Sequence, residues 1–195
     1  GLCATAESVI GLFEGSGLPR LEELRVDGAL DIERIVTTAP QTLSMPLRRL
    51  QWSGRAEKDL PWDRLHWFAD LRALDCFYQL RAGGVESFLT RAPIAGLTSL
   101  GIASAELHGA GASLLAKVPF TRLRRLDVYS TKLFPDVIGP LLVAPWLDGL
   151  EALNVAADEV GPDALARLKA RVKRVETFRV FGDSHARAIQ WYDQI

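Results

Sequence analysis

The sequence predicts an α/β fold built from seven consecutive units, each a short strand followed by a helical stretch. Three observations predict it. A leucine motif recurs at a nearly constant spacing, a second leucine column follows that motif at a fixed distance, and proline often precedes the next motif. Repetition with a period of about 20 to 50 residues is typical of proteins that stack one small structural unit many times.

The motif reads Leu-x-x-Leu-x-apolar and begins the units at Leu21, Leu47, Leu71, Leu97, Leu123, Leu150 and Val175. Consecutive units are separated by 26, 24, 26, 26, 27 and 25 residues. The second and third apolar residues alternate with polar ones, which is the period of a strand with one buried face. We therefore predict strands centred on Leu24, Leu50, Leu74, Leu100, Leu126, Leu153 and Phe178.

A second column marks the helical half of each unit. Eighteen residues after the first motif residue, units two to six have Leu65, Leu89, Leu115, Leu141 and Leu168. The same offset in unit one holds Ala39, so that unit is less regular. Proline cannot continue a helix interior, and the prolines that precede a strand are Pro19, Pro46, Pro93, Pro119 and Pro145. Each unit thus contains a strand, a turn, a helical stretch and a stop.

Strands this short are expected to stack side by side into a parallel sheet, with the helical halves packed behind it. Parallel crossovers within one sheet are right-handed, so we expect a right-handed solenoid. Because a helix is wider than a strand, the stack should curve, with the sheet on its concave side and the helices on its convex side.

We expect residues 1–195 to form a single domain, with one additional segment at each end of the seven units. Residues 4–13 resemble the helical half of a unit, so residues 1–20 are expected to form a partial unit. At the other end, Asp183 is a candidate cap for a helix over 184–194. Its apolar side would carry Ala188, Ile189, Tyr192 and Ile195. The first residue is glycine rather than methionine, so we expect a fragment of a longer protein.

These motifs resemble the leucine-rich-repeat family over nearly the whole chain. Within it, the ribonuclease-inhibitor-like or bacterial GALA type is the most similar, because its helical half reads roughly Gly-x-x-Gly-Ala-x-x-Leu-Ala. Residues 108–116 and 160–168 are similar to that pattern. The family usually has Asn at the ninth position of a unit, where this chain has Ala29, Arg55, Gln79, Ala105, Thr131, Asp158 and Asp183. We therefore expect irregular turns.

Composition narrows the class of protein. With 48% hydrophobic and 24% charged residues and a net charge of -1, the chain resembles an ordinary globular protein with no strong field toward nucleic acid or membranes. No apolar run is long enough to span a bilayer. The two cysteines, Cys3 and Cys76, are too few for a disulfide framework and are expected not to pair with each other. This favours a reducing, cytoplasmic location.

Catalytic and cofactor motifs are not found in the sequence. Phosphate-binding, dinucleotide-binding and zinc-protease patterns are missing, and His66, His108 and His185 fall in different units without partners at metal-ligand spacing. The glycine-rich stretch 108–112 lacks the lysine of a phosphate loop, which favours a structural role. Cys76 is expected to be buried and inert. We therefore predict no catalytic residues, no metal, no cofactor and no enzymatic activity.

Candidate binding residues lie at the third, fifth and seventh positions of each strand motif, which should point to the concave face. The selected set is Arg49, Asp75, Phe77, Arg125, Asp127, Tyr129, Asn154, Arg179 and Phe181. The aromatic members recur in every second unit, about 10 Å apart for strands spaced at about 4.8 Å. Exposed rings amid small residues resemble a protein-binding patch, although such rings can also simply cover a sheet.

The sequence therefore favours a protein-interaction module that binds another protein on the concave face. Two alternatives remain open. The chain could be the recognition arm of a larger enzyme or effector whose catalytic domain lies outside it. It could also bind anions or nucleic acid weakly through a basic helix at 163–174, with Arg167, Arg171 and Arg174 on one face and Lys169 and Lys173 nearby.

Overall fold

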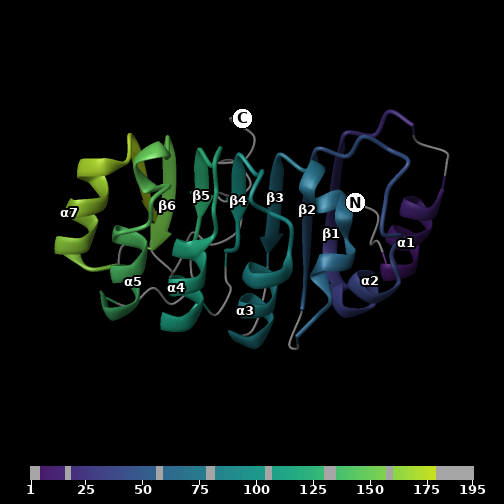
Figure 1. The fold of residues 1–195 in the computed structure, drawn as a ribbon, viewed down its shortest axis with the longest axis horizontal. Helices are drawn as coiled ribbons and strands as arrows, with labels where there is room; N and C mark the ends of the chain where they lie inside the picture. The colour runs from purple at the N-terminus through teal and green to yellow at the C-terminus, as the bar shows by residue number, and fades with distance from the viewer. Residues whose placement is uncertain are drawn as a thin grey trace.

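The computed structural model describes residues 5–15, 19–55, 59–77, 82–103, 107–129, 135–156 and 160–178. Over these residues the chain is an α/β protein with one parallel sheet (Figure 1). Seven strands lie in that sheet in sequence order, from β1 to β7, so each strand pairs with the strands of the units next to its own. The predicted α/β class and parallel pairing are confirmed.

The strands are β1 (Glu23–Asp31), β2 (Arg49–Arg55), β3 (Ala73–Phe77), β4 (Ser99–Gly101), β5 (Arg125–Asp127), β6 (Ala152–Ala156) and β7 (Arg174–Phe178). Each of the first six begins two residues after the predicted start of its unit. Backbone pairing places their central leucines side by side, at Leu24, Leu50, Leu74, Leu100, Leu126 and Leu153. The leucine motif thus located six strands and their register correctly.

The seventh strand differs from the prediction. Val175, rather than Phe178, pairs with Leu153, so the predicted strand centre is wrong by three residues. The physical reason is the burial of Val172, which lies three residues before Val175 and directly after α7. Val172 and Val175 have the same three-residue spacing as Leu150 and Leu153, with Val172 buried and Val175 partly buried against the core, and this pair starts the strand earlier. The third apolar position of the motif then falls on Thr177, which is polar, so the leucine pattern does not indicate this register.

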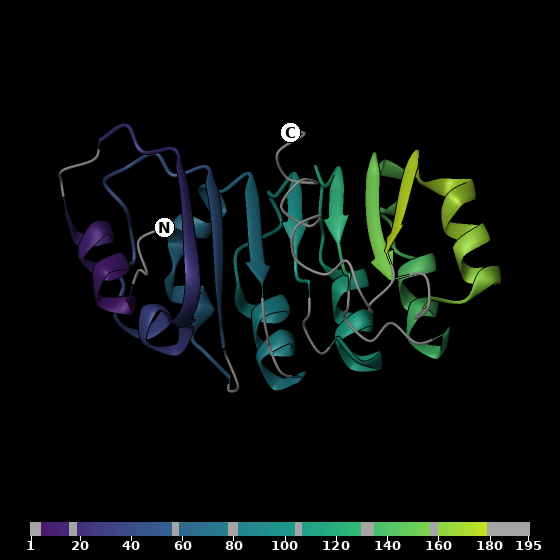
Figure 2. The same cartoon turned by 180° about the vertical axis from the view of Figure 1, so that it is seen from behind.

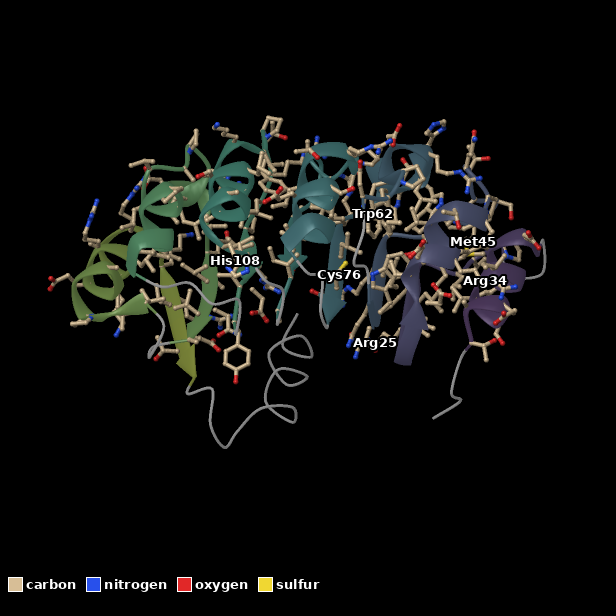
Figure 3. All side chains as sticks on the ribbon, turned by 90° about the horizontal axis from the view of Figure 1, so that it is seen from below. Arg25, Arg34, Met45, Trp62, Cys76 and His108 are labelled. Carbon is tan, nitrogen blue, oxygen red and sulfur yellow. The ribbon has the colours of Figure 1, made fainter. Side chains whose placement is uncertain are left out.

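The helices are α1 (Ala6–Glu14), α2 (Ile32–Thr38), α3 (Ala82–Arg91), α4 (Gly109–Lys117), α5 (Pro135–Leu142) and α7 (Pro162–Arg171), with 3₁₀ turns η1 (Trp62–Arg64), η2 (His66–Asp70) and η3 (Leu147–Gly149). Figure 3 shows α3, α4, α5 and α7 on one side of the sheet, and Figure 2 shows the molecule from behind. Helix α1 confirms the helical half predicted at the start of the chain.

The hydrophobic core lies between the sheet and the helices. The second leucine column is buried throughout, at Leu65, Leu89, Leu115, Leu141 and Leu168, and Ala39 is buried at the equivalent position of unit one. In unit two, two 3₁₀ turns stand where units three to six have a longer helix. Aromatic rings fill this place, with ring centroids 4.6 Å apart for Trp67 and Phe68 and 5.2 Å apart for Trp62 and Phe88.

Successive units are joined by backbone hydrogen bonds just before each strand. The Arg72 N–H donates to the Arg48 carbonyl at 2.7 Å, and the Thr98 N–H donates to the Arg72 carbonyl at 2.8 Å. The Arg124 N–H continues the series to the Thr98 carbonyl at 2.8 Å. Arginine side chains add a second connection, since Arg64 donates to the carbonyl of Val36 near the end of α2. These contacts join each unit to its immediate neighbour.

The irregular turns expected from the missing Asn stay a prediction, because the two described ninth-position residues, Ala29 and Arg55, lie within β1 and β2. Pairing of β1 with β2 shifts register between Val26 and Leu30. At Gly54 the strands β1 and β2 approach so closely that a Cβ atom would lie 2.4 Å from the Leu30 carbonyl oxygen. Most of the ninth-position residues lie outside the described residues, as does the helix expected over 184–194.

Candidate functional site

The sheet has a second face, opposite the helices, which we call the polar face. Because side chains alternate along a strand, the residues between the buried leucines share this face. Its first row is Glu23, Arg49, Ala73, Ser99, Arg125, Ala152 and Arg174. Its second row is Arg25, Gln51, Asp75, Gly101, Asp127, Asn154 and Glu176. In Figure 3, Arg25 lies on the side of the sheet away from Trp62.

The two ends of the polar face are accessible and charged. At the first end, the Arg25 and Glu23 side chains are 39% and 43% exposed, and Arg25 Nε lies 2.7 Å from a Glu23 carboxylate oxygen. Arg49, on the next strand, lies 3.8 Å from the same carboxylate group. At the other end, Arg174 Nε lies 3.1 Å from Glu176 Oε1. Exposed ion pairs of this kind add little stability, so these charges are available to a ligand.

The middle of the polar face, from β3 to β6, is buried. Asp127 is 0% exposed and Asn154 is 1% exposed, and Asp75 and Tyr129 are also buried. The expectation that these four side chains stand exposed for a partner is therefore wrong. Tyr129 should consequently stabilise the fold, contrary to the exposed aromatic column that the sequence suggested.

Several polar atoms in this buried stretch have incomplete hydrogen bonding. One carboxylate oxygen of Asp127 accepts a hydrogen bond from the Tyr129 N–H at 2.9 Å. By contrast, Ser99 Oγ, Arg125 Nη1 and Asn154 Oδ1 are buried without a hydrogen-bond partner in the part of the chain that the structure describes. Buried polar atoms in native proteins almost always have a partner, so these three atoms mark a place where another group belongs.

The nine predicted site residues separate into three groups. Arg49, Asp75, Arg125, Asp127 and Asn154 lie together on the polar face of β2, β3, β5 and β6, as expected. Tyr129 follows β5, and Phe77 ends β3 with a side chain outside the described part. Arg179 and Phe181 lie outside the described residues. In the register of β7, the first and second rows of the polar face are occupied by Arg174 and Glu176.

Sequence reasoning missed Arg174 and Glu176 as members of this face, and it placed Glu23 and Ser99 on the face without selecting them as binding residues. Arg174 and Glu176 were missed because the seventh strand was predicted three residues too late. The apolar pair Val172 and Val175, with the three-residue spacing of the other units, is the signal that could have revealed them. Glu23 and Ser99 stood at positions that the motif directed to this face, and their accessibility could not be decided from the sequence.

The predicted basic helix over 163–174 is also corrected. Helix α7 ends at Arg171, and Arg174 belongs to β7. Arg171 Nε lies 2.6 Å from Asp148 Oδ1, and this hydrogen bond raises the pKa of Arg171 and lowers that of Asp148. Lys173 Nζ lies 3.8 Å from Glu151. Acidic neighbours therefore offset three of the five basic side chains, which argues against a phosphate-binding stripe.

The glycine-rich stretch 108–112 has a packing role. It forms the first turn of α4, and a Cβ at Gly111 would lie 3.3 Å from a methyl carbon of Leu107 and 3.4 Å from one of Val85. Glycine there lets α4 approach α3 closely. Within the described ranges, no group of three or more His, Cys, Asp or Glu side chains could hold a metal ion. No helix in these ranges has the length and apolar character needed to cross a membrane.

Cys76 is a free, buried cysteine on the helix side of β3. The Trp52 indole N–H donates to its sulfur at 3.1 Å. Burial raises the pKa of the Cys76 thiol to about 12 from the usual 9.0, while the Trp52 hydrogen bond acts in the opposite direction and the charge of Asp75 raises the pKa further. The buried position that the sequence predicted is confirmed, and Cys3 lies outside the described residues.

This pKa predicts a loss of stability in alkali. In the unfolded chain the thiol ionises near its usual 9.0, while in the native chain it stays protonated to about 12. Ionisation therefore favours the unfolded state as pH rises through this interval. We expect the free energy of unfolding in urea to fall between pH 8 and pH 10.5 more steeply for the unaltered chain than for Cys76→Ala. Equal slopes for the two chains would contradict the buried-thiol assignment.

Comparison with known proteins found no match for this chain. No model of a protein family matches this chain, and neither curated proteins nor solved structures show a significant match to it. Its function must therefore be argued from the residues of the polar face and from the repeated units that align them.

Proposed function

We propose that this chain is a leucine-rich-repeat domain, a right-handed solenoid whose polar face is concave, and that it is a protein-interaction module without enzymatic activity. The repeat assignment is supported by the in-register stacking of equivalent leucines in six successive units. One observation supports binding above all. The accessible first end of the polar face aligns Glu23, Arg25, Arg49 and Gln51 on two adjacent strands.

The chemistry of this end suits a protein partner. Arginine is enriched at protein interfaces, because its guanidinium group forms several hydrogen bonds and stacks on aromatic rings. Arg25 and Arg49 share one carboxylate, that of Glu23, so an acidic residue of a partner can pair with either guanidinium without leaving a buried charge. Alternating charges on a surface favour a partner of complementary pattern. The free Cys76 thiol agrees with a reducing compartment, and we place the interaction in the cytoplasm.

The test compares two faces of the same protein. The unaltered chain serves as bait in a native lysate, and each captured protein is purified and its Kd measured by calorimetry. For the true partner, we expect Arg49→Ala combined with Gln51→Ala to weaken binding by about 2 kcal/mol or more, as for an interface hot spot. The melting temperature should change little, because substitutions at accessible positions usually alter stability by less than about 0.5 kcal/mol.

The matched control lies on the helix side. Lys117 ends α4 and Arg167 lies on α7, and both side chains are exposed. Lys117→Ala combined with Arg167→Ala removes two cations from the opposite side of the sheet and should leave Kd unchanged. If this control weakens binding and the Arg49 variant does not, the partner binds the helices and the proposed surface is wrong.

A further inference from the structure

The two outer strands of the sheet each have one edge that no other strand of the described residues pairs with. These strands are β1 and β7, and they lie at opposite ends of the sheet (Figure 2). The backbone N–H and C=O groups along the outer edge of a sheet can form hydrogen bonds with a strand of another chain. Each end of the sheet is therefore a candidate contact surface.

The hydrophobic core is incompletely covered at these same two ends. Leu24 in β1 and Val175 in β7 are only partly buried, whereas the equivalent leucines of the five inner strands are at most 2% exposed. Thr177 of β7 is exposed, although its counterpart in β6, Val155, is 0% exposed. A further strand beside β1 or β7 would bury these positions, as the inner strands bury one another.

We propose that β7 of one copy of this chain pairs in parallel with β1 of a second copy, so that the sheet continues from one molecule into the next. The pairing repeats the parallel register that already joins neighbouring strands within the chain. It places Val175 opposite Leu24 of the second copy, because these two residues hold the same central position in their strands. Two partly exposed apolar side chains are then buried against each other.

Charge complementarity identifies the second copy as the occupant. Arg174 pairs with Glu176 along β7, at 3.1 Å, and Arg25 pairs with Glu23 along β1, at 2.7 Å. These side chains are therefore already positioned along the two outer strands. In the proposed register each charge meets an opposite charge across the joint, which stabilises strand pairing. The pairs are Lys173 with Glu22, Arg174 with Glu23, and Glu176 with Arg25.

Contacts within the chain show that side chains at these positions reach across adjacent strands. Lys173 Nζ lies 3.8 Å from the carboxylate of Glu151, which precedes β6 as Glu22 precedes β1. Arg49 Nη1 lies 3.8 Å from the carboxylate of Glu23 on the neighbouring strand. The same distances between β7 and β1 of a second copy would let the charges at the joint pair directly.

The charges also select one register. A parallel slip of two residues keeps each side chain on its face, but it places Arg174 opposite Arg25 or Glu176 opposite Glu23, and like charges directly opposite destabilise pairing. A slip of one residue moves Val175 to the polar face. The proposed register avoids both penalties.

The alternative is an antiparallel contact between two β7 strands or two β1 strands around a two-fold axis. Such a contact also places arginine opposite glutamate. It leaves Lys173 opposite Thr177 and Glu22 opposite Val26, however, so neither of these charges gains a partner. It also reverses the strand direction that all six strand pairs of this sheet share. The parallel contact is therefore favoured.

The consequence is head-to-tail assembly. The two contacting surfaces differ, so every assembly keeps one unpaired β1 edge and one unpaired β7 edge, to which further copies can add. The charged ends of the polar face meet at each joint, and the polar face continues from copy to copy. This inference goes beyond the proposed function, because Arg49 and Gln51 lie on β2, outside the strands that pair.

Sedimentation velocity of the full chain over a wide range of concentrations tests the proposal. The mean mass of the unaltered chain should rise with concentration past that of a dimer. Two charge-reversed chains are compared with it, Glu23→Arg with Arg25→Glu and Arg174→Glu with Glu176→Arg. For each of these alone, the association constant should fall roughly tenfold or more, because two attractive pairs across the joint become repulsive. An equal mixture of the two reversed chains should associate again, since every joint between unlike copies is complementary.

The matched control is Asp63→Arg with Arg91→Asp, which reverses an exposed ion pair away from both outer strands and should leave association unchanged. The melting temperature of each chain shows that it is folded, and recovery in the mixture excludes misfolding as the cause of a loss. An unaltered chain that stays monomeric at every concentration overturns the proposal. Undiminished association of a reversed chain also overturns it, because an antiparallel contact remains complementary to itself after reversal. No binding partner is used, so either failure leaves the proposed function untouched.

Discussion

Replacing Trp62 by Ala is expected to lower the free energy of unfolding by about 3–5 kcal/mol, the range for removing a large aromatic side chain from a core. Trp62 is 0% exposed and meets Phe88 edge-on at 5.2 Å between ring centroids and Phe68 at 6.1 Å. Two large rings, Phe68 of the same unit and Phe88 of α3, lie against Trp62, so its removal leaves a cavity between them. Urea unfolding at neutral pH, followed by circular dichroism, measures the change.

Trp62→Phe provides the matched control. The indole N–H of Trp62 is buried without a hydrogen-bond partner in the described residues, so phenylalanine removes an unsatisfied donor along with part of the ring volume. These two effects oppose each other, and we expect less than half of the loss seen for Trp62→Ala. A Trp62→Ala chain within about 1 kcal/mol of the unaltered one would show that this aromatic cluster does not support unit two.

Leu126→Ala is expected to cost about 2–5 kcal/mol, as for other large-to-small changes in a core. Leu126 is 1% exposed and stands in register between Leu100 and Leu153. Because each unit contacts mainly its neighbours, the damage should be local. Amide hydrogen exchange should accelerate in β4, β5 and β6 and change little in β1.

Val143→Ala is the control for Leu126→Ala, since Val143 is 74% exposed and lies just after α5 in the same unit. It removes fewer carbon atoms, from a side chain that is mostly exposed, and should alter stability by less than about 0.5 kcal/mol. Uniform acceleration of exchange from β1 to β7 in the Leu126→Ala chain would contradict the nearest-neighbour description and favour one cooperative core.

The sequence by itself determined the strand–helix order, the parallel pairing of β1 to β6 and their register. These features depend on a local pattern repeated many times. Where the motif of one unit is weak, the spacing of the other units still indicates where its strand lies. A one-residue slip in pairing would turn every leucine of a strand toward the polar face, so the register is strongly specified. The same reasoning identified Arg49, Asp75, Arg125, Asp127 and Asn154 as members of one face, because alternation along a strand is a local property.

Only the tertiary structure decided three other features. The start of β7 followed from the burial of Val172 in the core, which overrode the weak motif at Val175. The end of α7 at Arg171 moved Arg174 from a helix to a strand. Most consequential for function, Asp127, Asn154 and Tyr129 are buried although their positions in the strand motif predicted an exposed face. Strand alternation determines which face a side chain is on, whereas its exposure depends on contacts between residues distant in sequence, which a local pattern does not contain.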